Sequence, residues 1–240
     1  SKTKGVAHAV IRSNLLQYIH PKSIHSFLYN PSYVGANSDF CESLFLQNGF
    51  STNQVLKIEA QRFNYLVKAK KKIDIQKTQS RKSILITTSI NPIETKELLE
   101  VFALSDVKFE NVYIKEHPNL PVKLIIDSLI VKFPNYEIVS GPMSKIFEYS
   151  DIIYTANGSS VLLESVMNKK YTVSLVSLSS LPMPAIDRAP NLYFVNNAEN
   201  LSKTLNKINL KIKTSISLDD KKSYLYTDED LTLWRDFLSK

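Results

Sequence analysis

Two polar stretches of the sequence carry side chains that could bind an anion. The first is "NVYIKEHPNLP", residues 111–121, in which a short apolar run ends at Lys115 and is followed by His117 and Pro118. Proline disfavours the helical region for the residue before it and stiffens the loop, so the ring of His117 would be held in place. The alternative is a surface histidine, or one bonded for structural reasons.

The second stretch is "DIIYTANGSSVLLESV", residues 151–166, which passes from an apolar run directly into a helical pattern. Its glycine allows close backbone approach, its serines can donate hydrogen bonds, and the free N–H groups of a helix start favour an anion. An acid four positions after the second serine would share its helical face. The candidate residues are Asn157, Gly158, Ser159, Ser160 and Glu164. The alternative is that the serines are ordinary N-caps.

Two more turns lead from an apolar run into a helical pattern. "TTSINPIE" brings Ser89 to such a turn, and "SGPMSKIF" brings Gly141, whose backbone could meet a nucleobase. The sequence contains no GxGxxG, GxxxxGK[ST] or GxSxG motif and no Cys/His cluster with metal-ligand spacing. The predicted site therefore depends on serine, histidine and backbone groups, and neither a metal nor a cofactor is expected.

The elements that would position these residues alternate regularly between residues 83 and 197. Apolar, β-branched runs alternate there with helix-compatible stretches near 93–104, 122–132, 143–149, 159–168 and 198–208. This alternation predicts an α/β, Rossmann-like parallel sheet with helices on both faces. Ligands bind at the carboxyl ends of the strands in such sheets, so the candidate residues are expected on one edge.

The remaining sequence suggests three further segments. Residues 1–67 hold only a few strand-like runs and one helical pattern, at 39–48, and are predicted to be the end of an N-terminal Rossmann-like domain. The basic stretch 68–82 is predicted to be a linker between that domain and residues 83–215. Residues 216–240 are predicted to form an amphipathic helix that packs on the body, with a capping box at Thr227.

Composition restricts the class of protein but not its function. Lys and Arg exceed Asp and Glu by 30 − 23 = 7, which suits an anionic partner of any kind. The single cysteine, Cys41, excludes an internal disulfide framework and favours a reducing compartment. No apolar run approaches the roughly 18 residues of a membrane span, and no signal peptide is visible. A cytoplasmic protein is expected, and a fragment or processed chain is one interpretation of its first residue, Ser1.

The two polar stretches together resemble a known family. "KEHP" and "NGSSVLLE" are similar to the HP and SS motifs of bacterial GT-B glycosyltransferases that use CMP-activated sugars, such as sialyltransferases, polysialyltransferases and Kdo transferases. "GVAHAVIR" resembles a G-x-x-H-G segment of related surface-carbohydrate proteins, although alanine replaces the second glycine. The resemblance covers residues 83–200 and is weak before residue 67. It implies that His117, Ser159 and Ser160 hold the CMP phosphate and that Glu164 lies near the ribose.

The activity that this resemblance implies is transfer of a sialic acid or Kdo-like sugar from CMP to a surface-polysaccharide or lipopolysaccharide acceptor. A glycolipid acceptor would bring the enzyme to the inner face of the cytoplasmic membrane, as a peripheral protein. CMP would leave from the anomeric carbon while His117, Lys115 and the serines stabilise the phosphate charge. His8 is the candidate base for the acceptor hydroxyl.

Three further functions stay open at this point. The same two motifs occur in teichoic-acid glycerophosphotransferases, which use CDP-glycerol. The chain could also be a non-catalytic nucleotide- or glycan-binding half of a split transferase, inactive until it meets a missing N-terminal domain or a partner chain. Nucleic-acid binding rests on net charge alone and is not expected.

Overall fold

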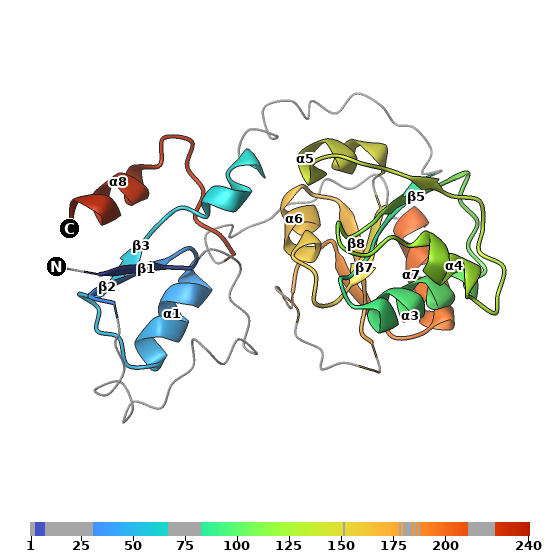
Figure 1. The fold of residues 1–240 in the computed structure, drawn as a ribbon, viewed down its shortest axis with the longest axis horizontal. Coiled ribbons are helices and arrows are strands. Elements are labelled where there is room, and N and C mark those ends of the chain that lie inside the picture. The colour runs from blue at the N-terminus through green and yellow to red at the C-terminus, as the bar shows by residue number, and fades with distance from the viewer. Residues whose placement is uncertain are drawn as a thin grey trace. The chain divides into compact units, whose positions relative to one another are not determined.

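The computed structural model describes residues 3–7, 31–66, 83–150, 152–177, 179, 184, 186, 188–210 and 224–240. The chain divides into two compact units, the first formed by Ser1–Ile73 with Asp219–Lys240 and the second by Asp74–Leu218. Figure 1 colours the chain from blue at its N-terminus to red at its C-terminus, so the blue and red parts of the first unit are easily found. The predicted linker and His8 lie outside the described residues.

A sheet of six parallel strands forms the centre of the second unit, in the order β6-β5-β4-β7-β8-β9. The strands are β4 (Ser83–Thr87), β5 (Asn111–Lys115), β6 (Glu137–Ile138), β7 (Ile152–Ala156), β8 (Tyr171–Leu175) and β9 (Leu192–Val195). Counted along the chain this is the doubly wound order 3-2-1-4-5-6, which reverses between β4 and β7. The predicted α/β, Rossmann-like sheet is confirmed.

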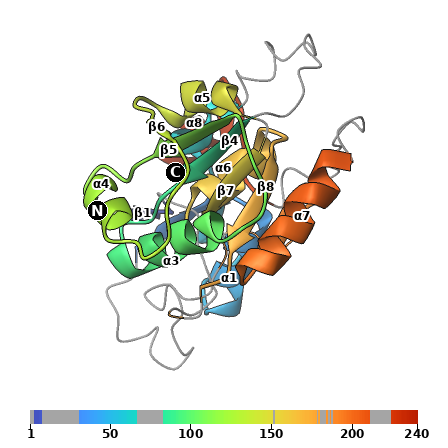
Figure 2. The same ribbon diagram turned by 90° about the vertical axis from the view of Figure 1, so that its right-hand side faces the viewer.

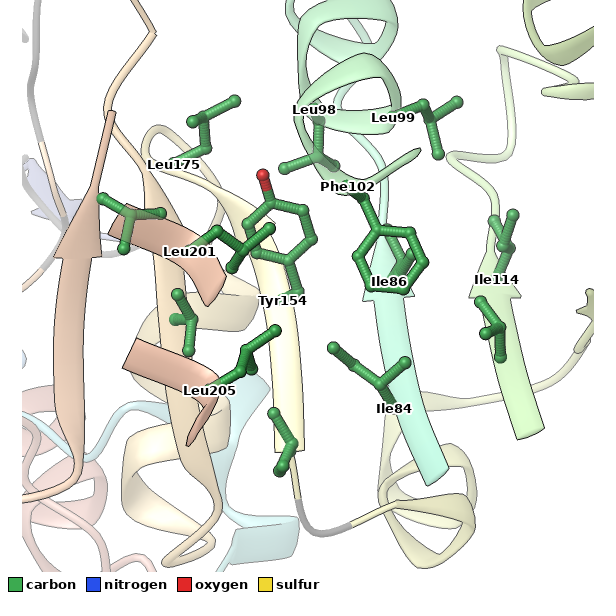
Figure 3. Packing of buried hydrophobic residues seen from close by; sticks show 14 of the residues in the cluster. Ile84, Ile86, Leu98, Leu99, Phe102, Ile114, Tyr154, Leu175, Leu201 and Leu205 are labelled. Atoms are coloured by element: carbon green, nitrogen blue, oxygen red, sulfur yellow. The ribbon is translucent and has the colours of Figure 1, made fainter. Parts of the chain in front are cut away.

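Helices cover both faces of this sheet because its strands alternate apolar side chains between them. Helices α3 (Pro92–Ala103) and α7 (Ala198–Leu210) lie over one face, as Figures 1 and 2 show. Figure 3 shows Ile84 and Ile86 of β4 beneath the buried side chains of α3. Leu85 points to the other face, where it packs with α5 (Met143–Ile146) and the start of α6 (Val161–Met167).

Side chains at its own start explain where α3 begins. The Asn91 side chain accepts a hydrogen bond from the N–H of Ile93 at 2.9 Å, and Pro92 occupies the first turn, where its missing N–H costs nothing. In contrast α4 (Lys123–Asp127) is shorter than the predicted helix over 122–132. The hydroxyl of Ser128 donates to the carbonyl oxygen of Ile125 at 2.7 Å, a local bond that competes with a further helical turn.

The first unit contains a sheet of three parallel strands in the order β1-β2-β3. The strands are β1 (Lys4–Val6), β2 (Tyr33–Ala36) and β3 (Val55–Lys57), and α1 (Asp39–Gln47) follows β2 close to the helix predicted over 39–48. A Cβ at Gly35 would lie 2.6 Å from the Cδ1 of Ile58, so any larger residue there would force the Ile58 side chain to shift.

The C-terminal helix α8 (Thr232–Ser239) also belongs to the first unit, and its predicted start at Thr227 is wrong. The carboxylate of Glu59, which is 1% exposed, accepts hydrogen bonds from the N–H groups of Leu233 at 2.8 Å and Trp234 at 2.9 Å. A residue far away in the sequence thus supplies the cap that was expected from Thr227, and the helix begins where that carboxylate meets it.

Burial makes Cys41 of α1 unreactive. It raises the pKa of the thiol from 9.0 to about 12, and the charge of Glu42 acts in the same direction. The native state therefore holds this proton more tightly than the unfolded state, so stability should fall between about pH 9 and pH 12 as the unfolded thiol ionises. We expect a thiol reagent to label this single cysteine at pH 8 only after unfolding. Rapid labelling of the native protein would contradict the burial.

Among the described residues, none of the helices combines the length and apolar character needed to cross a lipid bilayer.

Candidate functional site

The predicted binding residues gather on the carboxyl edge of the second unit's sheet. His117 follows β5, Ser89 follows β4, and the Asn157 to Ser160 segment follows β7. The strand order reverses between β4 and β7, and doubly wound sheets bind ligands beside that point. Neighbouring strands lie about 4.8 Å apart, so the loops after β5 and β7 are separated by about 10 Å, with the end of β4 between them.

Three backbone bonds fix the loop that carries His117. Its own N–H donates to the hydroxyl oxygen of Thr88 at 3.0 Å, and its carbonyl oxygen accepts from the N–H of Leu120 at 2.9 Å. The N–H of Asn119 donates to the ring nitrogen Nδ1 of His117 at 3.2 Å. Because Nδ1 accepts, the proton of the neutral ring is on Nε2. The partly buried ring can therefore donate from Nε2 to a ligand.

Glu116, which was not among the predicted site residues, links the two ends of the same loop. Its Oε2 atom accepts a hydrogen bond from the N–H of Val122 at 2.7 Å, directly before α4. The Nζ of Lys115 lies 3.4 Å from the carbonyl oxygen of Glu116, and Lys115 pairs with Thr87 in the last register position of β5 and β4. The exposed Pro118 completes the loop. The carboxylate of Glu116 thus stabilises the loop by accepting a hydrogen bond from the loop's backbone.

Asn157, directly after β7, is a buried residue of the site. It is 6% exposed, and its backbone N–H donates to the carbonyl oxygen of Leu175 at 3.1 Å. Its side-chain Oδ1 and Nδ2 atoms have no hydrogen-bond partner among the described residues. A buried polar group without a partner costs about 1–3 kcal/mol, so such groups occur where something else requires them.

The two serines after Gly158 have different roles. The hydroxyl oxygen of Ser159 accepts from the N–H of Val161 at 3.2 Å, which is an ordinary capping role. Ser160 makes no such cap, and its hydroxyl donates to Oε1 of Glu164 at 3.3 Å. The predicted shared face of Ser160 and Glu164 is therefore confirmed. Glu164 itself is buried, with 5% of its surface exposed.

Ser89 and Gly141 differ in what they can offer. The Ser89 hydroxyl donates to Oε2 of Glu94 at 2.7 Å and accepts from the N–H of Asn91 at 3.1 Å, so it is engaged at the start of α3. Gly141 has a φ of +117°, a left-handed conformation that favours glycine, and no described atom lies within 4 Å of a Cβ built there. Its backbone is therefore open to a ligand.

No metal cluster accompanies these groups in the described part of the chain. No group of three or more His, Cys, Asp or Glu side chains that could hold a metal ion occurs there. The polar groups that meet on the edge are hydrogen-bond donors and a buried carboxylate, an arrangement suited to a phosphate with hydroxyls beside it.

Comparison with known proteins shows relatives by fold only. No protein-family model matches the sequence, and no curated protein matches it. Among solved structures, the UDP-GlcNAc 2-epimerase of Methanocaldococcus jannaschii, in complex with UDP-GlcNAc and UDP, matches with a TM-score of 0.64 at 15% identity, over 98% of this chain and 69% of that one. The Neisseria meningitidis UDP-GlcNAc 2-epimerase bound to UDP-GlcNAc matches with a TM-score of 0.60 at 14% identity, over 98% and 70%.

A third structure, S. aureus MnaA with UDP, matches with a TM-score of 0.53 at 15% identity, over 81% of this chain and 52% of that one. The chain thus spans between about half and 70% of these relatives. At such identities the likeness shows the fold, which is that of GT-B proteins built from Rossmann-like units.

Proposed function

We propose that the second unit binds the phosphate of a nucleotide-activated sugar at the carboxyl edge of β5, β4 and β7. The observation that carries this proposal is the buried side chain of Asn157, which has no partner among the described residues and follows β7 at the reversal of strand order. The Nε2–H of His117 would bind the same ligand, and the hydroxyl of Ser160 would do so by turning away from Glu164. The fold is also shared with proteins whose structures hold UDP-GlcNAc or UDP.

The reaction we propose is transfer of a sialic acid or Kdo-like sugar from CMP to a surface-polysaccharide or lipopolysaccharide acceptor. The resemblance of "KEHP" and "NGSSVLLE" to the motifs of CMP-sugar transferases supports CMP. As CMP leaves the anomeric carbon, negative charge grows on its phosphate, and donors already in place stabilise that charge without reorganising. Each such donor typically contributes about 3 kcal/mol to lowering the barrier. His8 stays our proposal for the base that accepts the acceptor's proton.

A second candidate is an enzyme of UDP-activated sugars, because the solved structures of similar fold include epimerases of UDP-GlcNAc. A CDP-glycerol transferase and a non-catalytic binding half remain as further candidates. Incubating the chain with a CMP-sugar, CDP-glycerol and UDP-GlcNAc separately, and measuring the products of each, distinguishes these activities. Turnover of UDP-GlcNAc alone would replace CMP in the proposal, whereas binding without turnover would favour the binding half.

The side chain of Asn157 provides a sharper test of the site. A leucine at this position has the same branched arrangement of side-chain heavy atoms and no polar atom to bury, so Asn157→Leu should raise the free energy of unfolding by about 1 kcal/mol. The same variant should bind CMP at least about tenfold more weakly, because two ligand contacts are lost. Urea denaturation and calorimetric titration measure the two effects.

The stability and the CMP affinity of Asn157→Leu, taken together, decide whether Asn157 has a ligand-binding role or a structural one. Lower stability of Asn157→Leu would mean that the amide supports the fold, and unchanged CMP affinity would remove it from the site. A matched control is Asn48→Leu in the first unit, where the side-chain Nδ2 donates to the carbonyl oxygen of Leu44 at 2.8 Å. That substitution should lower stability and leave CMP binding unchanged.

A further inference from the structure

The backbone of His117 is held by a side chain from a different strand. The hydroxyl of Thr88, one residue beyond β4, accepts a hydrogen bond from the N–H of His117 at 3.0 Å. The N–H of Thr88 donates to the carbonyl oxygen of Lys115 at 3.1 Å, which continues the pairing of β4 with β5. Thr88 thus contacts the histidine loop on both sides of Glu116. Because Thr88 is only 6% exposed, its side chain has little room to move.

The hydrogen bond between Thr88 and His117 determines the orientation that the ring of His117 can take. The ring is held at Nδ1 by the N–H of Asn119, two residues further along the same loop. That bond forms only while the turn from His117 to Leu120 keeps its shape, and the bond from Thr88 fixes the first residue of the turn. Without the hydroxyl, the N–H of His117 would lose its acceptor, and the turn would lose its hydrogen bond to the residue that follows β4.

We infer that Thr88 is a positioning residue, whose hydroxyl holds the His117 loop so that Nε2–H points to the phosphate of the ligand. The inference rests on the proposed function and adds a residue outside both polar motifs. Thr88 acts through His117 in this account and makes no contact with the ligand. A threonine hydroxyl suits the task because it accepts the bond while its methyl group restricts its rotamers at the buried strand end.

The first test needs no ligand. Thr88→Val keeps the shape of the side chain and removes the acceptor, whereas Thr88→Ser keeps the acceptor. Amide hydrogen exchange followed by NMR should show the Asn119 N–H exchanging about tenfold faster in Thr88→Val, the effect of losing one hydrogen bond, and at the native rate in Thr88→Ser. Thr88→Cys, with a weak acceptor of similar size, should fall between them. Unchanged Asn119 exchange in Thr88→Val would overturn the inference.

The second test is a double-mutant cycle on CMP affinity measured by calorimetry. Thr88→Val should weaken CMP binding about tenfold in the native sequence and less than about twofold in a His117→Ala background, because a positioning residue has nothing left to position there. Equal losses in both backgrounds would mean that Thr88 acts independently of His117, which contradicts the inference. If the chain does not bind CMP at all, the proposed function fails, and the exchange measurement still decides the role of Thr88.

A matched control comes from the same edge of the sheet. The hydroxyl of Thr155 on β7 accepts from the Thr87 hydroxyl at 2.7 Å and lies 3.4 Å from the carbonyl oxygen of Thr87, to which it donates. Thr155→Val also removes a buried hydroxyl, so it should lower stability while leaving Asn119 exchange at the native rate. Faster Asn119 exchange in this control would show a general loosening of the sheet, and the specific role of Thr88 would be rejected.

Discussion

His117→Ala is expected to weaken CMP binding by about tenfold to a hundredfold. The native ring has Nδ1 occupied by the N–H of Asn119, so Nε2–H is left as the donor to the phosphate. A hydrogen bond to a charged group contributes about 1.5–3 kcal/mol, and each 1.4 kcal/mol corresponds to a factor of ten in the dissociation constant. Calorimetric titration of the purified chain with CMP measures the change directly.

Two more substitutions at this position separate the ligand contact from the loop contact. Asn has an oxygen close to the place of Nδ1 and no donor at the place of Nε2, so His117→Asn should keep the loop and bind CMP as weakly as His117→Ala. Gln carries an N–H group close to the place of Nε2, so His117→Gln should recover part of the affinity. Native affinity in both His117→Ala and His117→Asn would remove this residue from the site.

Glu59→Ala is expected to cause the largest loss of stability, about 3 kcal/mol. The carboxylate accepts two N–H groups at the start of α8, and the carbonyl oxygen of Glu59 accepts the indole Nε1–H of Trp234 at 2.8 Å. Removing the side chain leaves two partly buried N–H groups without this acceptor, each costing up to about 1–3 kcal/mol. Trp234 is the single tryptophan of the chain, so its fluorescence during urea denaturation follows the docking of α8 directly.

A second substitution of Glu59 and a control substitution on α8 test whether the lost stability comes from the carboxylate. Glu59→Gln keeps one oxygen and should recover part of the stability, because one N–H group regains an acceptor. Asp236→Asn removes an exposed carboxylate from α8 and should change stability by less than about 0.5 kcal/mol. A loss of that small size in Glu59→Ala, with unchanged Trp234 emission, would show that the carboxylate does not hold the helix.

The sheet of the second unit could be predicted from the sequence because each of its strands is marked by a local pattern of residue types. Runs such as "SILIT" and "IIYTA" are apolar, rich in β-branched residues and bounded by polar turns, and each became a buried strand of the parallel sheet. The start of α3 can also be predicted from the sequence, since Asn91 and Pro92 are residue types that favour the positions where the helix begins. Strand pairing then brought the residues after β5, β4 and β7 to one edge, as the fold class requires.

Residues whose partners are distant in the sequence could not be interpreted in this way. The start of α8 depends on Glu59, more than 170 residues earlier, so the capping box at Thr227 was misleading. The role of Glu116 depends on a turn that places the N–H of Val122 beside its carboxylate. Burial of the Asn157 side chain without partners among the described residues is a property of the packed sheet that no sequence pattern reveals.

The two serines, for which capping and ligand binding were the alternatives, differ in their hydrogen bonds. Ser159 accepts a backbone N–H at the helix start, so a capping role explains it without a ligand. Ser160 instead donates to the carboxylate of Glu164, an arrangement that local capping does not require. The candidate base, His8, lies outside the described residues, and its role stays a prediction.

The central claim is that the second unit holds a nucleotide phosphate at the edge formed by β5, β4 and β7. Calorimetric titration of the native chain with CMP, with UMP, AMP and inorganic phosphate as comparisons, tests it most directly. We expect the chain to bind CMP in preference to the other three, with a large loss of affinity in Asn157→Leu and in His117→Ala. Absence of binding to every one of these ligands would contradict the claim.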